Sequence, residues 1–342
     1  MRHTAAKLVA AVAVTAATVL AAVPAQAADP SPIPNAVDIV GTGSDTTSTY
    51  LSQVSADYNA SIAGAPASTP RLYSWEPLGT SPITPKTGGA SIARPNGSGA
   101  GITALINNTS ATVDFARSSR GRQASDPASI LFVAFAKDAV TWSAKATGGH
   151  APANLTTAQL KGIYECTITN WSAVGGTAGT IKPFLPQNGS GTRTFFLQAI
   201  GGATPVVPGA CVTSGPQENT GTTAVLDDVD AIFPYSVAHY ISQVFGGHST
   251  ATDAPGPLTL RNVNSVVPVN PTTHVINAPF AGSAYGRVIN NVVRTNDWNT
   301  AGAYQTTLKG IFGPAGWICT HPATITNYGF LTLPGTACGT TS

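Results

Sequence analysis

Short apolar runs alternate with stretches of helical periodicity through most of the chain. Apolar runs that predict strands lie at 36–40, 113–116, 130–135 and 139–142. Apolar positions three or four residues apart predict helices around Leu51, Val54 and Tyr58, around Ile102, Leu105 and Ile106, and around Phe195, Phe196 and Ile200. Thr156 and Gln159 have the spacing of a capping box, which predicts a further helix start. This alternation predicts an α/β fold with mostly parallel sheets.

Three segments rich in Gly, Ser and Thr each stand just before a predicted helix. They are GTGSDTT at 41–47, NGSGAG at 96–101 and QNGSGTR at 187–193. The first N–H groups of a helix have no intrahelical acceptor, and the helix dipole is positive there. Such a segment alone is most often an ordinary capped turn. Three of them in one chain predict a cleft that gathers helix N-termini around one anion.

A fourth segment, DFARSSRGR at 114–122, concentrates positive charge in a chain that has little of it. It places three arginines beside two serines, namely Arg117, Arg120, Arg122, Ser118 and Ser119. A guanidinium group binds an oxyanion through two parallel hydrogen bonds, so an arginine here is a candidate cationic partner. Arg193, at the end of the third Gly/Ser/Thr-rich segment, is a competing candidate, and a solvated turn with local ion pairs is the structural alternative.

The sequence lacks the motifs of several enzyme classes. It contains no GxxxxGK[ST] nucleotide loop, and none of the loop serines lies in a GxSxG elbow. The histidines are scattered singly, and the cysteines have no zinc-site spacing. We therefore expect a protein that is not an enzyme and that needs neither a metal nor another cofactor. A secreted phosphatase is a weaker alternative, and an adhesion or structural protein with a vestigial cleft is another.

Residues 1–27 have the features of a signal peptide. Arg2, His3 and Lys7 precede an Ala/Val/Leu run that ends in Ala25-Gln26-Ala27, so we expect cleavage near Ala27. No cysteine lies near this point, which argues against a lipoprotein, and the run is too short and too rich in Ala to favour a membrane anchor. We expect a secreted protein, or a periplasmic one if the cell has an outer membrane.

The charge of the mature chain excludes some classes of partner, and its length indicates the number of lobes. Without Arg2 and Lys7, 15 basic residues face 15 acidic ones, and only 9% of the residues are charged. Nucleic acid and anionic membranes are recognised by dense basic patches, so neither is an expected partner. The mature length suits two lobes rather than one core. We place one lobe at 28–135 with 241–342 and the other at 136–240, and expect a monomer.

The four cysteines indicate disulfides in an exported protein. Three pairings are possible. Cys166–Cys211 with Cys319–Cys338 is favoured, because neighbours in sequence tend to share a lobe.

These motifs together resemble the phosphate-binding proteins of bacterial phosphate ABC transporters. The likeness runs from about Asp38 to Tyr240 and includes GTGSDTT, GSGAG, VDFARSS, LTTAQLKGIYECTITNW, NGSGTR and AIFPYSVAHY. It implies the type II periplasmic-binding-protein fold, in which two α/β lobes, each a mixed and mostly parallel sheet flanked by helices, close on one phosphate. It also implies phosphate uptake or scavenging, with an ABC transporter permease as a partner.

The resemblance implies ligand contacts at matching positions, namely Asp45, Thr46, Ser98, Ser119, Ser190, Gly191 and Thr192. The candidate ligand set also takes in neighbouring loop residues and two of the arginines: Ser44, Gly99, Arg117, Ser118, Asn188 and Arg193.

Three positions depart from the family pattern. Ser119 stands where the family has an aspartate that accepts the proton of phosphate, and Pro186 stands where it has an arginine. Asp45 adds a carboxyl group where a neutral hydroxyl is usual. A hydroxyl both donates and accepts, so Ser119 would discriminate less between phosphate and sulfate. The departures keep open a second reading, in which the ligand is another small oxyanion or polar solute.

Overall fold

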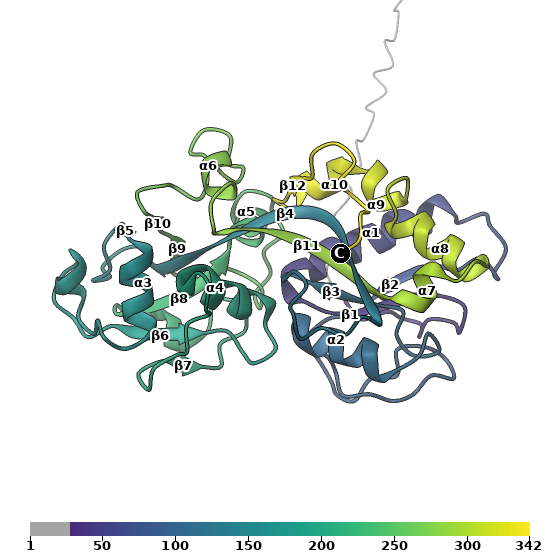
Figure 1. Ribbon diagram of the computed structural model, residues 1–342, viewed down its shortest axis with the longest axis horizontal. Helices are drawn as coiled ribbons and strands as arrows, with labels where there is room; N and C mark the ends of the chain where they lie inside the picture. Colours follow the sequence, from purple (N-terminus) through teal and green to yellow (C-terminus); the bar gives the residue numbers. More distant parts are fainter. Residues whose placement is uncertain (1–27) are drawn as a thin grey trace, which may run out of the picture.

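Two α/β lobes lie side by side in the computed structural model, which describes residues 28–342 (Figure 1). The expected signal peptide, residues 1–27, falls outside the described residues. Strands β4 (Ile130–Lys145) and β11 (Gly286–Arg294) are antiparallel neighbours and run from one lobe into the other. The architecture is therefore the two-lobed α/β fold that the sequence predicted.

Within residues 28–342, ten strands form one mixed sheet, whose main path has the order β2-β1-β3-β11-β4-β8-β6-β7. The lobe that holds the N-terminal part of the described chain contributes β1 (Ile39–Gly43), β2 (Leu72–Ser74) and β3 (Phe115–Ser118). Its helices are α1 (Ser48–Ser61), α2 (Ser98–Asn107), α7 (Thr295–Asn299), α8 (Ala303–Phe312), α9 (Trp317–Thr320) and α10 (Pro322–Asn327). The short strand β12 (Leu331–Thr332) pairs with β4.

The other lobe is built around β8 (Ala231–Ser236), which is antiparallel to β4 and parallel to β6 (Lys182–Leu185). Strand β7 (Thr213–Ser214) extends this side of the sheet. The helices of this lobe are α3 (Thr157–Tyr164), α4 (Gly191–Gly201), α5 (Val237–Val244) and α6 (Ala278–Ala281).

Residues after 240 take part in both lobes. Strand β9 (Leu258–Leu260) pairs with the end of β4, and β10 (Asn262–Val263) pairs with β5 (Asn154–Leu155). These pairings place 258–263 beside strands of the segment 136–240. The sequence analysis placed residues 258–263 in the lobe of 28–135, whereas these strands pair with the other lobe. The lobe boundaries as a whole stay a prediction.

The predicted elements are present, with shifted ends. Strand β1 begins at Ile39 and includes Gly41–Gly43, so the first half of the first Gly/Ser/Thr-rich segment is strand rather than loop. The runs at 130–135 and 139–142 belong to a single strand, β4. The capping box is confirmed: Gln159 N donates to Thr156 Oγ1 over 3.2 Å, and Thr156 N donates to Gln159 Oε1 over 2.8 Å.

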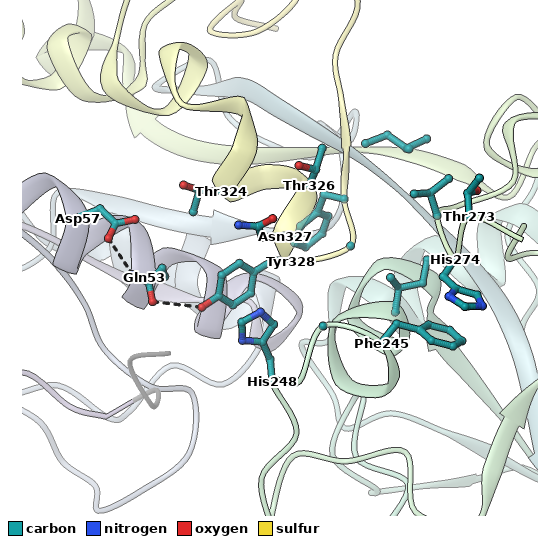
Figure 2. A pocket seen from close by; sticks show the side chains of 16 residues that line it. Gln53, Asp57, Phe245, His248, Thr273, His274, Thr324, Thr326, Asn327 and Tyr328 are labelled. Carbon is teal, nitrogen blue, oxygen red and sulfur yellow. Dashed lines mark hydrogen bonds between the residues drawn. The ribbon is translucent and has the colours of Figure 1, made fainter. Parts of the chain in front are cut away.

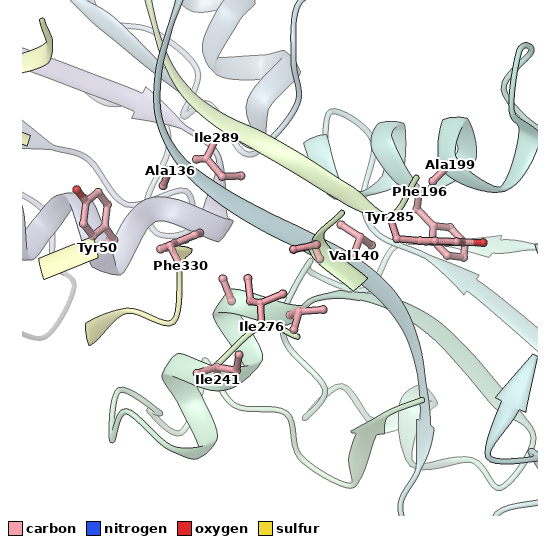
Figure 3. Close-up of a cluster of buried hydrophobic side chains, with 14 of the residues drawn as sticks. Tyr50, Ala136, Val140, Phe196, Ala199, Ile241, Ile276, Tyr285, Ile289 and Phe330 are labelled. Carbon is pink, nitrogen blue, oxygen red and sulfur yellow. The ribbon is translucent and has the colours of Figure 1, made fainter. Parts of the chain in front are cut away.

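One hydrophobic cluster follows β4 and β11 across both lobes (Figure 3). Ala136 and Val140 of β4 lie at its centre. In the lobe that holds α1, the Tyr50 ring stacks on Phe135 at 5.3 Å. The two lobes thus share a core as well as a sheet, which fixes the strands that connect them.

Both disulfides match the favoured pairing. Cys166 is bonded to Cys211, and Cys319 is bonded to Cys338. The first closes a span of 45 residues around β6 and α4, and the second a span of 19 residues near the end of the chain.

Candidate anion-binding site

Hydroxyl groups from separate Gly/Ser/Thr-rich segments meet between the lobes. Ser98 is the first residue of α2, and its Oγ lies 3.2 Å from Ser119 Oγ and accepts from Ser119 N over 3.0 Å. Gly191 opens α4 from the opposite lobe, and a Cβ added there would lie 2.3 Å from Ser98 Oγ and 2.5 Å from Ser119 Oγ. A side chain at position 191 would therefore hold the lobes apart.

A second contact of the same kind joins the first and third segments. Thr46 Oγ1, just before α1, lies 3.3 Å from Thr192 Oγ1 of α4. Ser190 caps α4 by accepting from Arg193 N over 3.0 Å. We call the five hydroxyl residues the interlobe cluster; they are Thr46, Ser98, Ser119, Ser190 and Thr192, and each is at most 2% exposed.

The lobes are closed on each other around this cluster. Gly99 N donates to Gly189 O over 2.9 Å, so the second and third segments touch through their backbones. Asn96 Nδ2 donates to Gln217 Oε1 over 2.9 Å, and Gln187 Nε2 donates to Asn96 Oδ1 over the same distance. The cluster between these contacts is buried from solvent, which strengthens each polar interaction inside it.

The remaining candidate loop residues have mixed surroundings. Ser44 is fully buried, and its Oγ has no partner among the described residues, so it is a free donor beside Thr46. Ser118 Oγ donates to Arg120 O, and Asn188 is exposed. Ser44 thus has a buried hydroxyl two residues before Thr46, whereas the side chain of Ser118 is occupied locally and that of Asn188 faces solvent.

The two candidate arginines have protein partners. The Arg117 guanidinium is fully buried and donates to Ser44 O over 3.0 Å and Trp75 O over 2.8 Å, so it holds the backbone around the end of β1. Burial lowers the pKa of Arg117 to about 10. Arg193 donates to Pro186 O over 3.0 Å and to Ser214 Oγ over 2.6 Å. Their role as cationic partners of an anion stays a prediction.

Arg287, which the sequence did not single out, reaches the interlobe cluster from β11. Its Nη2 donates to Thr192 Oγ1 over 3.1 Å, and its Nε and Nη2 bind Asp138 of β4 over 3.0 and 2.7 Å. Its Nη1 is buried and has no partner among the described residues. A pocket of about 500 Å³, lined in part by Phe195, leads from solvent to this arginine.

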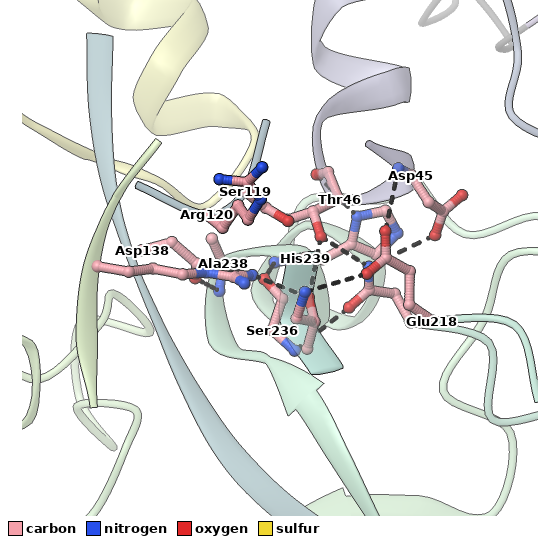
Figure 4. Close-up of polar contacts among 12 residues, drawn as sticks. Asp45, Thr46, Ser119, Arg120, Asp138, Glu218, Ser236, Ala238 and His239 are labelled. Atoms are coloured by element: carbon pink, nitrogen blue, oxygen red, sulfur yellow. Dashed lines mark hydrogen bonds and ion pairs between the residues drawn. The ribbon is translucent and has the colours of Figure 1, made fainter. Parts of the chain in front are cut away.

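Glu218 is the second residue that sequence reasoning missed. Its side chain is fully buried, and its carboxylate accepts from groups of both lobes (Figure 4). Oε1 accepts from Asp45 N over 3.2 Å, whereas Oε2 accepts from Ser190 Oγ and from Thr192 N, the latter over 3.4 Å. The carboxylate thus lies at the start of α4 and at the 3-10 turn that leads into α1.

A partly buried ion pair flanks this position. His239 Nε2 lies 2.8 Å from Asp253 Oδ1, and His239 Nδ1 lies 3.2 Å from Thr46 O. Burial alone would lower the pKa of His239, but the adjacent Asp253 carboxylate raises it to about 9, so the imidazolium donates from both nitrogens at neutral pH. Burial also raises the pKa of Asp45 well above its ordinary value, and the charges of Asp253 and Glu218 raise it further.

A large open pocket lies elsewhere. It has a volume of about 680 Å³ and is lined by α1, the end of α5 and the segment around α10 (Figure 2). His248 stacks on Tyr328 at 4.1 Å, and Phe245 stacks on His274 at the same distance. No residue of the interlobe cluster lines this pocket, and the cluster residues are buried.

Among residues 28–342, no helix is both long and apolar enough to cross a bilayer. The same part of the chain has no group of three or more His, Cys, Asp and Glu residues placed to hold a metal ion.

The fold and the junction between its lobes define a two-lobed protein of the periplasmic-binding type. The chain belongs to the PBP superfamily domain family, whose model matches residues 25–253. Three solved structures of similar fold illustrate this. An ABC-type phosphate transport receptor from Vibrio cholerae is 17% identical, with 86% of this chain and 100% of that chain covered and a TM-score of 0.56.

A putative phosphate ABC transporter substrate-binding protein from Clostridium perfringens, solved with bound phosphate, is also 17% identical, covers 86% of this chain and 99% of its own, and has a TM-score of 0.56. A phosphate-binding protein from Stenotrophomonas maltophilia is 15% identical over 88% of this chain and 91% of its own, with a TM-score of 0.50. At these identities the likeness shows the fold. No curated protein matches the chain significantly in sequence.

Proposed function

We propose that this protein binds a small oxyanion between its lobes, with inorganic phosphate as the first candidate, and that it serves uptake or scavenging as a secreted, non-enzymatic solute-binding protein. The observation that carries the proposal is the convergence of the five hydroxyls of the interlobe cluster from both lobes. Thr46 meets Thr192, and Ser98 and Ser119 meet at Gly191.

A tetrahedral oxyanion needs many hydrogen-bond donors, and the hydroxyl and backbone N–H groups at this junction offer them without a metal ion. Hydroxyl groups and the first N–H groups of helices donate to phosphate oxygens, and the positive ends of α2 and α4 favour its charge. The junction is closed and dry, which strengthens such hydrogen bonds. The unpaired Oγ of Ser44 adds a donor that has no other partner among the described residues.

The cationic partner that fits best is Arg287. Its buried Nη1 is unpaired, and its Nη2 already reaches Thr192 Oγ1. Arg117 and Arg193 are the alternatives, although each donates to backbone carbonyls in the closed protein. Since Pro186 removes the arginine that the resembling family has in this region, an arginine from β11 supplies the charge from the other side.

The names of the similar structures support phosphate as the ligand. The Vibrio cholerae protein is described as a phosphate transport receptor, and the Clostridium perfringens protein was solved with bound phosphate. By the same comparison, an ABC transporter permease is the proposed partner of this chain.

A second candidate ligand is another oxyanion, such as sulfate. The observation that favours it is Ser119, whose hydroxyl contacts Ser98 Oγ where a carboxylate would reject ligands that carry no proton. Sulfate would then bind with an affinity close to that of phosphate.

Calorimetric titration of the phosphate-stripped mature protein tests the proposal. Phosphate, arsenate and sulfate should be titrated separately, into the natural protein and into Ser190→Ala. The variant should bind phosphate at least about tenfold more weakly, because it loses a hydroxyl donor.

Thr156→Ala is the matched control, since Thr156 also caps a helix but lies exposed on α3. It should lose similar stability and keep its phosphate affinity. Absence of heat with all three anions would refute oxyanion binding, and heat with sulfate alone would refute phosphate as the ligand.

A further inference from the structure

We propose that the Glu218 carboxylate occupies the anion position of the closed, ligand-free protein, and that an incoming oxyanion must displace it. The inference rests on the proposed function and deepens it, because it identifies a residue of this chain that sets the affinity of that same site.

The carboxylate takes the donors that an oxyanion would need. Its two oxygens accept from the backbone N–H groups of Asp45 and Thr192 and from the hydroxyl of Ser190. These donors belong to two different lobes, so one side chain bridges the junction as a bound anion would. The backbone of Glu218 is also fixed, because its N–H group donates to Gln187 Oε1 over 2.8 Å.

Two residues next to these donors carry buried polar atoms without a hydrogen-bond partner among the described residues. They are Arg287 Nη1, on the guanidinium that binds Thr192, and Ser44 Oγ, on the residue before Asp45. A carboxylate has two oxygens in one plane, whereas phosphate has four in a tetrahedron. A tetrahedral anion therefore has oxygens for more donors than the Glu218 carboxylate binds.

The charges around Glu218 make simultaneous occupancy unfavourable. Asp45 and Glu76 contribute further carboxyl groups nearby, whereas Arg117, Arg287 and the His239 imidazolium, which is paired with Asp253, contribute positive charge. A phosphate added beside the Glu218 carboxylate would place like charges together at a buried junction, which is unfavourable. The two anions therefore compete for one set of donors.

Competition predicts a measurable gain when the carboxylate is removed. If the form with Glu218 in the site makes up about nine tenths of the ligand-free protein, its removal tightens apparent phosphate affinity about tenfold. Glu218→Ala should show this gain. Glu218→Gln keeps one acceptor oxygen and loses the charge, so it should fall between Glu218→Ala and the natural protein.

Glu165→Gln is the matched control, because Glu165 is exposed on the surface at the end of α3. It removes the same charge and should leave phosphate affinity unchanged. Thermal melting of each variant would show that it is folded before titration. Glu218→Gln preserves the proposal's test if Glu218→Ala does not fold.

A second readout separates this inference from the proposed function. Backbone amide exchange at Asp45 and Thr192, followed by NMR without ligand, should be at least about tenfold faster in Glu218→Ala than in the control, because both N–H groups lose their acceptor. Unchanged exchange would overturn the occupancy of the site by Glu218.

The outcomes are distinguishable. Phosphate binding that is equal or weaker in the Glu218 variants would overturn displacement and leave phosphate binding intact. Binding by the variants alone would support the occupancy of the site by Glu218 and refute phosphate uptake by the natural protein. If neither the natural protein nor the variants bind phosphate, the proposed function fails. The exchange rates then decide whether the Glu218 carboxylate accepts from Asp45 N and Thr192 N.

Discussion

Replacing Arg287 by methionine should destabilise the protein by about 3–5 kcal/mol, which is the expected loss when one partner of a buried ion pair is removed. Arg287 and Asp138 are almost completely buried, with side chains 1% and 0% exposed, and are joined at 2.7 Å. Methionine conserves much of the volume of the arginine stem, so the loss reports the charge rather than a cavity.

The magnitude follows from what Asp138 keeps. In the natural protein it accepts from Arg287 through two nitrogens, from Ser236 Oγ over 2.8 Å and from Ala238 N over 2.9 Å. The variant retains two neutral donors and no countercharge. A buried carboxylate with this partial compensation remains costly, because hydrogen bonds from uncharged groups replace only part of its lost hydration.

Urea unfolding followed by tryptophan fluorescence would measure the difference. Arg122→Met is the control, since Arg122 is exposed and donates to backbone carbonyls, and it should change stability by less than about 1 kcal/mol. Adding Asp138→Leu to Arg287→Met should restore much of the loss, because no unpaired charge remains. A loss below about 1 kcal/mol in Arg287→Met, or a double variant no more stable than it, would refute the assigned role of the pair.

Three other perturbations have defined outcomes. The free energy of unfolding should fall by up to about 3 kcal/mol as the pH rises, because the pKa of His239 is raised from 6.5 to about 9: the stabilisation is complete below pH 6.5 and is lost through pH 9. His239→Gln should remove this slope in urea unfolding, and an unchanged slope would contradict the assignment. Gly191→Ala should weaken phosphate binding at least about tenfold in calorimetry and enlarge the radius of gyration in X-ray scattering, since the new methyl group would lie 2.3 Å from Ser98 Oγ; an unchanged radius would show that the junction accommodates it. Replacing Cys166 and Cys211 together by serine should lower the free energy of unfolding by about 4 kcal/mol in the same assay, because the disulfide restrains a span of 45 residues in the unfolded chain. A change near zero would show that this restraint does not stabilise the protein.

Local patterns predicted the elements of the fold well. The periodicity around Leu51, Ile102 and Phe196 corresponds to α1, α2 and α4, because amphipathic spacing is a property of each helix by itself. The ends were less predictable. Gly41 and Gly43 belong to β1, since backbone pairing with β2 and β3 continues through glycine regardless of its low strand preference.

The candidate site was predictable where it rests on loops and not where it rests on tertiary contacts. Ser98, Ser190 and Thr192 stand at helix starts, and their sequence neighbours reveal that. Arg287 contacts Thr192 from 95 residues away, and Glu218 contacts Asp45 from 173 residues away, so no local spacing marks them. The strand GRVINNVVR carries an arginine near each end, and this pattern does not distinguish Arg287 from Arg294.

The long pair of strands that joins the lobes has a mechanical consequence. Backbone pairing between β4 and β11 runs from Ile130 with Arg294 to Ala139 with Gly286, with one register shift between Ile289 and Asn290. Because both strands run through both lobes, one lobe cannot change its orientation relative to the other without bending or twisting this ladder.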